Sequence, residues 1–260
     1  MIHSVVIVGS GNLAEALARA VADSPLCLRQ VFGRNCDRVA TIAALARTEG
    51  QTDPSRLAAA DLYLIAVSDA AVAEVAASLP IDPAAVVAHT AGSVSVDALP
   101  ARFPRRAVFY PFQTFTKGRA VDFSQIPILI ETAAPALRDE LETFARQLSR
   151  TVLYADSALR GQVHLAGVFA CNFANHLFEL GGEVLRRAGA SADLLHPLIA
   201  ETTAKALAAA RPAAVQTGPA VRGDLPTQER HLRLLAEDER LREMYRLITQ
   251  SIWETSKKIS

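Results

Sequence analysis

Short apolar runs alternate with segments of helical periodicity over the first 150 residues. Ser4–Gly9 (SVVIVG) is continuously apolar and rich in β-branched residues, which is typical of a strand buried on both faces. Asn12–Ser24 follows with apolar residues at helical spacing. Similar strand-like runs occupy Leu28–Asn35, Ala60–Ser68, Ala84–Ser93, Arg106–Phe115 and Ile126–Glu131. The intervening helical segments are Asp37–Gly50 and Asp69–Pro80. This alternation predicts an α/β fold with a doubly wound, mostly parallel sheet.

The pattern changes after about Tyr154. Asp156–Ala190 keeps a 3.6-residue apolar period for its whole length, which predicts one long helix. A second helix is expected over Ser191–Ala210 with Ser191 as its cap, and a last one over Thr227–Lys258 starting at Thr227. We therefore expect a dinucleotide-binding domain over residues 1–152 and a second, all-helical domain over residues 153–260.

Composition narrows the class of protein. The chain has 27 basic and 27 acidic residues, so it has no electrostatic footprint for nucleic acid or an anionic membrane. Its three cysteines lack C-x-x-C spacing, which argues against a disulfide framework or a zinc site, and no metal is expected. No signal-peptide pattern and no apolar run of ~18 residues is present. These features predict a soluble, cytoplasmic protein.

A glycine-rich turn links the first strand to the first helix. It reads Gly9-x-Gly11-x-x-Ala14, and it follows a buried strand and opens a helix, as a dinucleotide-binding turn does. A pyrophosphate would meet the helix N-terminus there. The alternative is a turn that serves packing only. The expected cofactor contacts at the turn are Gly9, Ser10, Gly11, Asn12 and Leu13.

Arg34 stands twenty residues beyond Ala14, where NAD-binding proteins place an acidic residue. A guanidinium there can grip a 2′-phosphate in bidentate fashion, so we expect NADP, with Asn35 beside it. Arg38 could add a second charge. The alternative is that Arg34 is a solvated loop residue.

Three strand ends carry polar residues, and in parallel sheets such ends face the ligand. Val67, Ser68 and Asp69 follow one strand, and His89, Thr90 and Ser93 follow another. The third end supplies Tyr110, Gln113, Thr114 and Lys117. We expect Val67, Ser68, His89 and Thr90 to contact the cofactor, with the three residues His89, Thr90 and Ser93 on the nicotinamide side.

The spacing of residues on the expected long helix predicts a polar stripe along one side of it. At 100° per residue, His164, Val168, Cys171, Asn172 and Asn175 fall within an arc of about 100°. Polar groups in an apolar stripe are costly unless they are paired or used, so we interpret the stripe as facing the substrate. The alternative is a histidine satisfied by backbone and asparagines that hold a helix contact.

A further polar segment runs from Gln216 to His231 and contains Arg222 and Asp224. Arg222 could bind an anion or carboxylate. It could equally form a subunit contact through an Arg222–Asp224 network, and the sequence does not separate these alternatives.

Several motifs in order resemble one family along essentially the whole chain: GSGNLA, DLYLIAVSD, HTAGS, YPFQTFTK, IPILIE, HLAGVFACNFANHL and QTGPAVRGD. That family joins a Rossmann-like NADP-binding domain to a helical C-terminal domain of unknown function. It is related to pyrroline-5-carboxylate reductase, deazaflavin-dependent NADP reductases and the 6-phosphogluconate dehydrogenase group. The resemblance implies an NADP-linked oxidoreductase whose helical domain pairs two subunits and closes the cleft.

The resemblance transfers residues only in part. In the β-hydroxyacid dehydrogenases a lysine on the first long helix is followed four residues later by an asparagine. Here His164 lies near the corresponding place and Val168 follows it. Lysine-assisted hydroxyacid chemistry is therefore not expected.

The hypothesis from sequence is hydride transfer between NADPH and a small C=O or C=N substrate. His164 would donate the proton, and Asn172 and Asn175 would hold the substrate. The alternatives are an NADP-binding regulatory or scaffold protein without turnover, and a redox-neutral enzyme. The substrate, the direction and a deazaflavin partner stay open. The long helix is apolar around much of its circumference, which predicts a homodimer formed through the helical domain.

Overall fold

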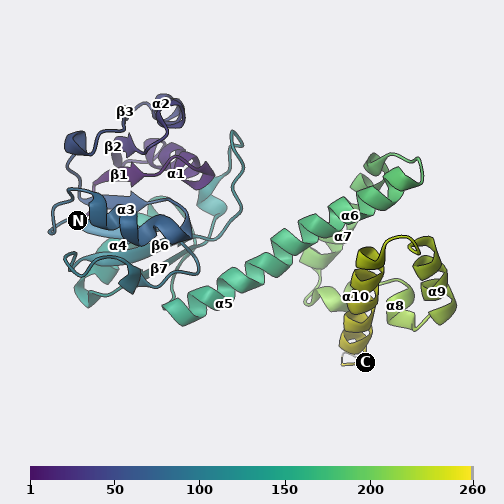
Figure 1. Ribbon diagram of the computed structural model, residues 1–260. Helices are drawn as coiled ribbons and strands as arrows, with labels where there is room; N and C mark the ends of the chain where they lie inside the picture. The colour runs from purple at the N-terminus through teal and green to yellow at the C-terminus, as the bar shows by residue number, and fades with distance from the viewer. Residues whose placement is uncertain (259–260) are drawn as a thin grey trace. The chain divides into compact units, whose positions relative to one another are not determined.

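The computed structural model describes residues 1–258 and contains two compact units, Met1–Ala174 and Asn175–Ser260. The first unit is built on one eight-stranded sheet (Figure 1). Its strand order is β3-β2-β1-β4-β5-β6-β7-β8, and every neighbouring pair is parallel except β6 and β7. The strands are β1 (Ser4–Val8), β2 (Cys27–Phe32), β3 (Glu49–Gln51), β4 (Leu62–Ile65), β5 (Val86–His89), β6 (Arg106–Pro111), β7 (Ile128–Thr132) and β8 (Val152–Tyr154). This arrangement confirms the doubly wound, mostly parallel sheet.

Helices cover both faces of the sheet. Leu17 of α1 (Asn12–Ala22), Ile42 of α2 (Cys36–Leu45) and Phe144 of α4 (Arg138–Arg146) belong to one apolar core. Val72 of α3 (Val72–Ser78) packs with Phe103 in the core of the opposite face. In β1, Val5 and Ile7 enter the first core, whereas Val6 and Val8 enter the second, as the geometry of a strand buried on both faces requires.

The helix expected to reach Gly50 is shorter than predicted, because α2 ends at Leu45 and Gly50 lies in β3. A Cβ at Gly50 would lie only 3.0 Å from a methyl group of Val39 and 3.1 Å from the Cβ of Ala43. Gly50 therefore lets β3 approach α2 closely, and it does not end the helix. At the other edge, β8 extends the sheet to Tyr154, two residues past the expected domain boundary.

The predicted long helix exists as three consecutive segments: α5 (Ser157–Gly167), a π-helical stretch over Val168–Phe173, and α6 (Ala174–Arg187). The π-helical stretch has wider turns than an α-helix. The helical wheel used for the polar stripe therefore holds only as far as Val168.

The second unit holds five helices among its described residues: α6, α7 (His196–Ala208), α8 (Pro219–Arg222), α9 (Leu225–Leu234) and α10 (Glu239–Lys257). Ser191 caps the 3₁₀ turn that leads into α7. The prediction of a single terminal helix starting at Thr227 was wrong, because two helices, α9 and α10, occupy this part of the chain. Asp224 caps α9 by accepting a hydrogen bond from the Thr227 N–H at 3.1 Å, and Asp238 caps the separate helix α10.

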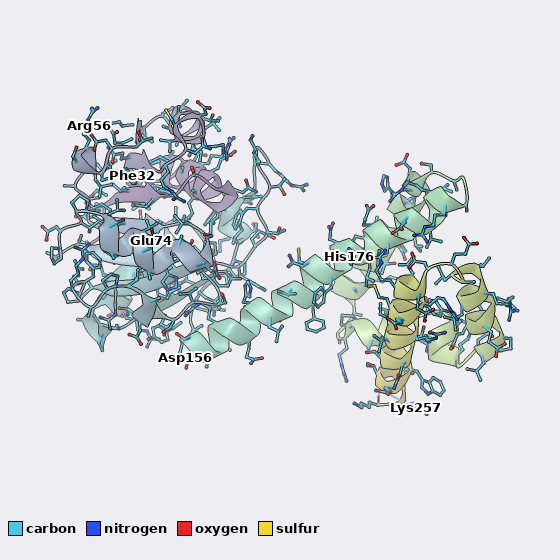
Figure 2. The ribbon with its side chains drawn as sticks, in the orientation of Figure 1. Phe32, Arg56, Glu74, Asp156, His176 and Lys257 are labelled. Atoms are coloured by element: carbon cyan, nitrogen blue, oxygen red, sulfur yellow. The ribbon has the colours of Figure 1, made fainter. Side chains whose placement is uncertain are left out.

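A buried ion pair fixes the start of α5 on the sheet. Asp156 caps this helix (Figure 2) by accepting a hydrogen bond from the Leu159 N–H at 2.8 Å. One turn on, the Arg160 side chain is only 1% exposed and is paired with the Glu131 carboxylate on β7. Arg160 also donates to the Val94 carbonyl, and the Ser157 hydroxyl lies 3.1 Å from each Glu131 oxygen. These bonds determine where α5 leaves the sheet.

We expect Arg160→Met to lower the free energy of unfolding by about 3–5 kcal/mol, because it leaves the Glu131 carboxylate without its buried cation. The double variant Arg160→Met, Glu131→Leu should recover much of that loss, since it removes both charges. Urea denaturation measures both variants. Arg146→Met is the control, because Arg146 is 54% exposed in its pair with Glu142 and should contribute less than about 1 kcal/mol. An equal loss in the single and double variants would contradict this account.

Candidate active site

The two glycines of the β1–α1 turn serve different needs. Gly9 has φ +143°, and a Cβ there would lie 2.1 Å from the Ala66 carbonyl oxygen, so a side chain is excluded. Its N–H donates to the Phe32 carbonyl at 2.7 Å, which joins the turn to β2. A Cβ at Gly11 would meet no described atom within 4 Å. Gly11 is the N-cap of α1, and no side chain of the described residues caps that end. The backbone N–H groups in the first turn of α1 therefore remain available to bind an anion.

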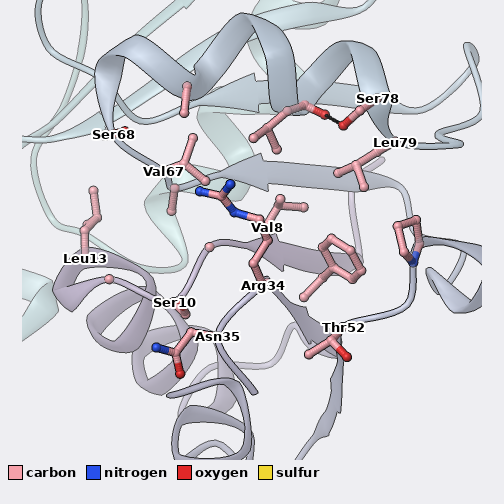
Figure 3. A pocket seen from close by; sticks show the side chains of 18 of the residues that line it. Val8, Ser10, Leu13, Arg34, Asn35, Thr52, Val67, Ser68, Ser78 and Leu79 are labelled. Atoms are coloured by element: carbon pink, nitrogen blue, oxygen red, sulfur yellow. Dashed lines mark hydrogen bonds between the residues drawn. The ribbon is translucent and has the colours of Figure 1, made fainter. Parts of the chain in front are cut away.

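A cavity of about 610 Å³ adjoins this turn (Figure 3). Nine of the eleven predicted cofactor residues line it: Gly9, Ser10, Gly11, Asn12, Leu13, Arg34, Asn35, Val67 and Ser68. Figure 3 shows the Arg34 side chain extending from the end of β2 into this cavity. The open approach at Gly11, the free helix end and a cation across the cavity fit a dinucleotide phosphate. The residues present therefore fit the predicted cofactor.

Arg38 does not provide the second phosphate contact suggested by the sequence. Its guanidinium lies 2.9 Å from the Glu15 carboxylate of α1, and its Nε donates to the Ser10 carbonyl at 3.3 Å. Burial raises the pKa of Glu15, but hydrogen bonds from Arg38 and Arg19 outweigh that effect and hold the pKa below its ordinary value. Arg38 is thus used to fasten α2 to the glycine turn. In the part of the chain that the structure describes, Arg34 has no such carboxylate partner.

The loop after β6 connects the glycine turn to a second cavity. The Asn12 side-chain amide donates to the Phe115 carbonyl at 3.1 Å, and the Gly118 N–H donates to Glu15 at 3.2 Å. Gln113 and Thr114 of the same loop line the second cavity, which measures about 370 Å³. The loop is therefore hydrogen-bonded to Asn12, which lines the first cavity, and it forms part of the wall of the second.

In the second cavity, His164 lies beside residues from the carboxyl end of β6. It is lined by Tyr110, Phe112, Gln113, Thr114, His164, Gly167, Val168, Ala170, Cys171 and Asn172. The Tyr110 hydroxyl lies 3.1 Å from Nδ1 of His164. A Cβ at Gly92 would lie 2.7 Å from the Tyr110 ring and 2.8 Å from that same nitrogen. The absence of a side chain at Gly92, just beyond β5, therefore leaves the space that Tyr110 and His164 occupy.

Burial and a neighbouring carboxylate set the pKa of Tyr110. Burial raises the pKa of Tyr110, and the Asp69 carboxylate raises it further, so the phenol stays protonated near neutral pH. Asp69 accepts a hydrogen bond from the Ser93 hydroxyl at 2.5 Å. Sequence reasoning missed that Tyr110 contacts His164 and that Gly92 leaves space for both side chains. The partners are 54 residues apart, and no local pattern signals the contact.

The π-helical stretch Val168–Phe173 interrupts the α-helix that was expected to carry the polar stripe. His164 and Asn172 line the cavity, whereas Asn175 is not among its lining residues and is exposed on α6. The catalytic role of all three stays a prediction. For Asn175 the helical wheel was the only argument, and it does not hold through the wider π turns.

His89 and Thr90 lie beneath the strand ends and line neither of these cavities. The His89 ring is fully buried, with Nε2 3.2 Å from the Ser95 carbonyl and Nδ1 accepting from the Ala91 N–H at 3.2 Å. Both ring nitrogens are thus used by backbone. Burial lowers the pKa of His89 to about 4, so the ring is neutral at pH 7. The Thr90 hydroxyl is buried and lies 3.4 Å from the Ile65 carbonyl.

Two family descriptions match the chain. Residues 4–92 match "NADP oxidoreductase coenzyme F420-dependent", and residues 126–252 match "Domain of unknown function (DUF2520)". No curated protein matches. A Bacteroides fragilis protein of known structure, described as a candidate NADP oxidoreductase, is 37% identical over 97% of this chain and 98% of its own, with a TM-score of 0.90. The chain belongs to this family of NADP-oxidoreductase-type Rossmann domains joined to a DUF2520 domain.

More distant structures share the fold alone. A Thermotoga maritima protein is 21% identical over 98% of both chains, with a TM-score of 0.74. An imine reductase from Pseudomonas sp. is 18% identical over 91% of this chain and 88% of its own, with a TM-score of 0.62. The family match and the Bacteroides fragilis protein support an NAD(P)-dependent oxidoreductase.

No helix within residues 1–258 is long and apolar enough to cross a membrane. The same residues contain no group of three or more histidine, cysteine, aspartate or glutamate side chains placed to hold a metal ion.

The buried His89 predicts a pH dependence of stability. Its pKa is about 4 in the folded protein and ~6.5 when unfolded, so below pH ~6.5 the unfolded chain binds a proton that the folded chain does not. We expect the free energy of unfolding to fall by about 3 kcal/mol from this group as the pH drops from 6.5 to 4. Urea denaturation across this range should give a flatter profile for His89→Asn. The exposed His196→Asn serves as the control. Equal slopes in all three proteins would contradict the assignment.

Proposed function

We propose that the protein is an NADP-dependent oxidoreductase that transfers a hydride to or from a small C=O or C=N substrate. The observation that carries the proposal is the loop after β6, which is hydrogen-bonded to Asn12 of the first cavity and lines the second. The residues of the first cavity fit a dinucleotide, and the second cavity presents an imidazole that contacts a half-buried phenol. A regulatory protein would need only the first. When bound, the nicotinamide cofactor supplies or accepts the hydride, and the chain must bind, orient and move the proton.

The residues at the glycine turn and Arg34 would hold the cofactor. The pyrophosphate would be held by the N–H groups at the start of α1, and the 2′-phosphate by the fork of Arg34. Arg38 and Glu15 neutralise one another, so their pair shapes the turn without adding charge. Preference for NADP over NAD therefore depends on Arg34.

Arg34→Ala tests this assignment. Loss of a charge-assisted contact should weaken NADPH binding about ten- to a hundredfold and leave NADH binding nearly unchanged. Calorimetric titration of both cofactors measures the effect. Arg47→Ala is the matched control, since Arg47 is 78% exposed and lies outside the cavity. Equal NADPH affinity in the wild type and in Arg34→Ala would remove Arg34 from this role, and absence of binding by both cofactors would overturn the function.

His164 is the proton donor in the proposed reaction. In the direction of reduction, an imidazolium gives the proton on Nε2 to the substrate oxygen or nitrogen, while its Nδ1–H donates to the Tyr110 hydroxyl. The ring is left neutral, and the same contact keeps it oriented. Asn172, on the wall of the same cavity, would donate or accept a hydrogen bond to the substrate.

His164→Ala should lower turnover by about 10²–10⁴-fold, because it removes the general acid. Tyr110→Phe should lower it less, since it removes only the group that orients the ring. The rates are measured with NADPH on the best substrate from a screen of small ketones and cyclic imines. His176→Ala controls for loss of a histidine, because His176 is exposed on α6 and does not line the cavity. Near-wild-type turnover in His164→Ala would show that another group supplies the proton.

We further propose that two copies pair through the helical unit. Its large apolar side chains are mostly exposed, including Leu198 at 62% and Leu247 at 67%. Among its described residues, only Leu180, Gly182, Ala220 and Leu241 are buried. A unit of this size needs a larger core than that, and a two-fold partner is the commonest cover.

Sedimentation at micromolar concentration should therefore give twice the chain mass of 27.8 kDa. Leu198→Lys should shift the protein toward the monomer, because it places a charge in the apolar contact. Leu45→Lys, at an exposed leucine of α2, should leave the mass unchanged. A monomeric wild type would overturn the pairing.

A further inference from the structure

A third cavity lies wholly within the helical unit and contains no residue of the cofactor site or of the His164 cavity. It measures about 520 Å³ and is formed by α8, α9 and α10. Its walls are largely apolar, with Leu225 and the Trp253 ring among them. Gly223 allows this shape: it has φ +63°, and a Cβ there would lie 3.3 Å from the Trp253 ring. The left-handed turn after α8 therefore brings the backbone close to the indole.

The charged side chains that line this cavity are positive. Among residues 1–258 they are Arg222 and Arg246. Arg246 is engaged by Glu239 at 3.2 Å, whereas Arg222 has no hydrogen bond and no carboxylate within ion-pair distance among residues 1–258. No hydrogen bond joins Asp224 to Arg222: the Asp224 carboxylate caps α9 through the Thr227 N–H, and hydrogen bonds from Thr227, with a smaller effect of the Arg222 charge, hold its pKa below the ordinary value. The N–H groups of the Arg222 guanidinium are therefore without a hydrogen-bond partner among residues 1–258, beside an apolar cavity.

We infer that this cavity binds a small organic carboxylate with a ring-sized apolar body. Arg222 is the group that receives the carboxylate, since a guanidinium fork matches its two oxygens. The apolar body would lie along Leu225 and the Trp253 ring, and Thr249 adds a hydroxyl to the same wall. Ligand sites commonly combine such apolar walls with one or two fixed polar groups. This inference does not depend on the proposed function, because it uses none of the residues of the cofactor site.

Trp253 is the only tryptophan of the chain, so its fluorescence reports on this cavity alone. The full-length protein without cofactor is titrated with cyclohexanecarboxylate, which does not absorb where tryptophan is excited. We expect a saturable change in emission. The neutral isostere cyclohexanecarboxamide and inorganic phosphate should each bind at least about tenfold more weakly, because one lacks the charge and the other the apolar body.

Variants at Arg222 test the assigned group. Arg222→Gln should weaken binding of cyclohexanecarboxylate about tenfold or more, and Arg222→Lys should fall between it and the wild type, because lysine keeps the charge but lacks the fork. Arg233→Gln is the matched control on α9, since Arg233 is exposed and outside the cavity. Circular dichroism verifies that each variant is folded.

Three results would overturn the inference: no saturable response in the wild type, an equal response to the carboxamide or to phosphate, or unchanged binding in Arg222→Gln. None of them bears on cofactor binding, so the proposed function would stand or fall separately.

Discussion

The buried pair of Arg160 and Glu131 is the interaction on which the candidate site depends. It joins the first turn of α5 to β7, and the Val94 carbonyl adds a third point of attachment. His164 follows Arg160 by one helical turn, so the pair determines where the imidazole meets Tyr110 and Gly92. A buried charge pair is a costly way to gain stability, but it tolerates few alternative arrangements. Its value here is the fixed position of α5.

The glycine turn is a second constraint, and it is coupled to the first through the loop after β6. Gly9 cannot carry a side chain because of the Ala66 carbonyl, and the pair of Arg38 and Glu15 fastens the turn from the other side. Asn12 then holds the Phe115 carbonyl of the loop. The same loop walls the cavity of His164. Rigid backbone at the cofactor side thus supports the side chains of the other cavity.

Sequence periodicity predicted the sheet and most of its helices, because strands buried on both faces leave long apolar runs such as Ser4–Gly9. It failed where the decisive contact is distant or subtle. Gly50 looked like a helix end but is a close approach of β3 to α2. The π-helical turn carries no sequence signal, so the place of Asn175 could not be read from a helical wheel. Nine of the predicted cofactor residues line one cavity because a local motif and its neighbouring strand ends place them there, whereas His89, predicted on the same grounds, is bonded to backbone.

The central claim is that the glycine turn and the His164 cavity form one site. The most direct test is NMR of protein with ¹⁵N-labelled histidine, titrated with NADP⁺, with the His164 resonances assigned from a His164→Gln variant. The account predicts that the ring nitrogens of His164 shift on binding, while those of the exposed His196 do not. Binding of NADP⁺ without any shift at His164 would contradict it, because the two cavities would then be separate.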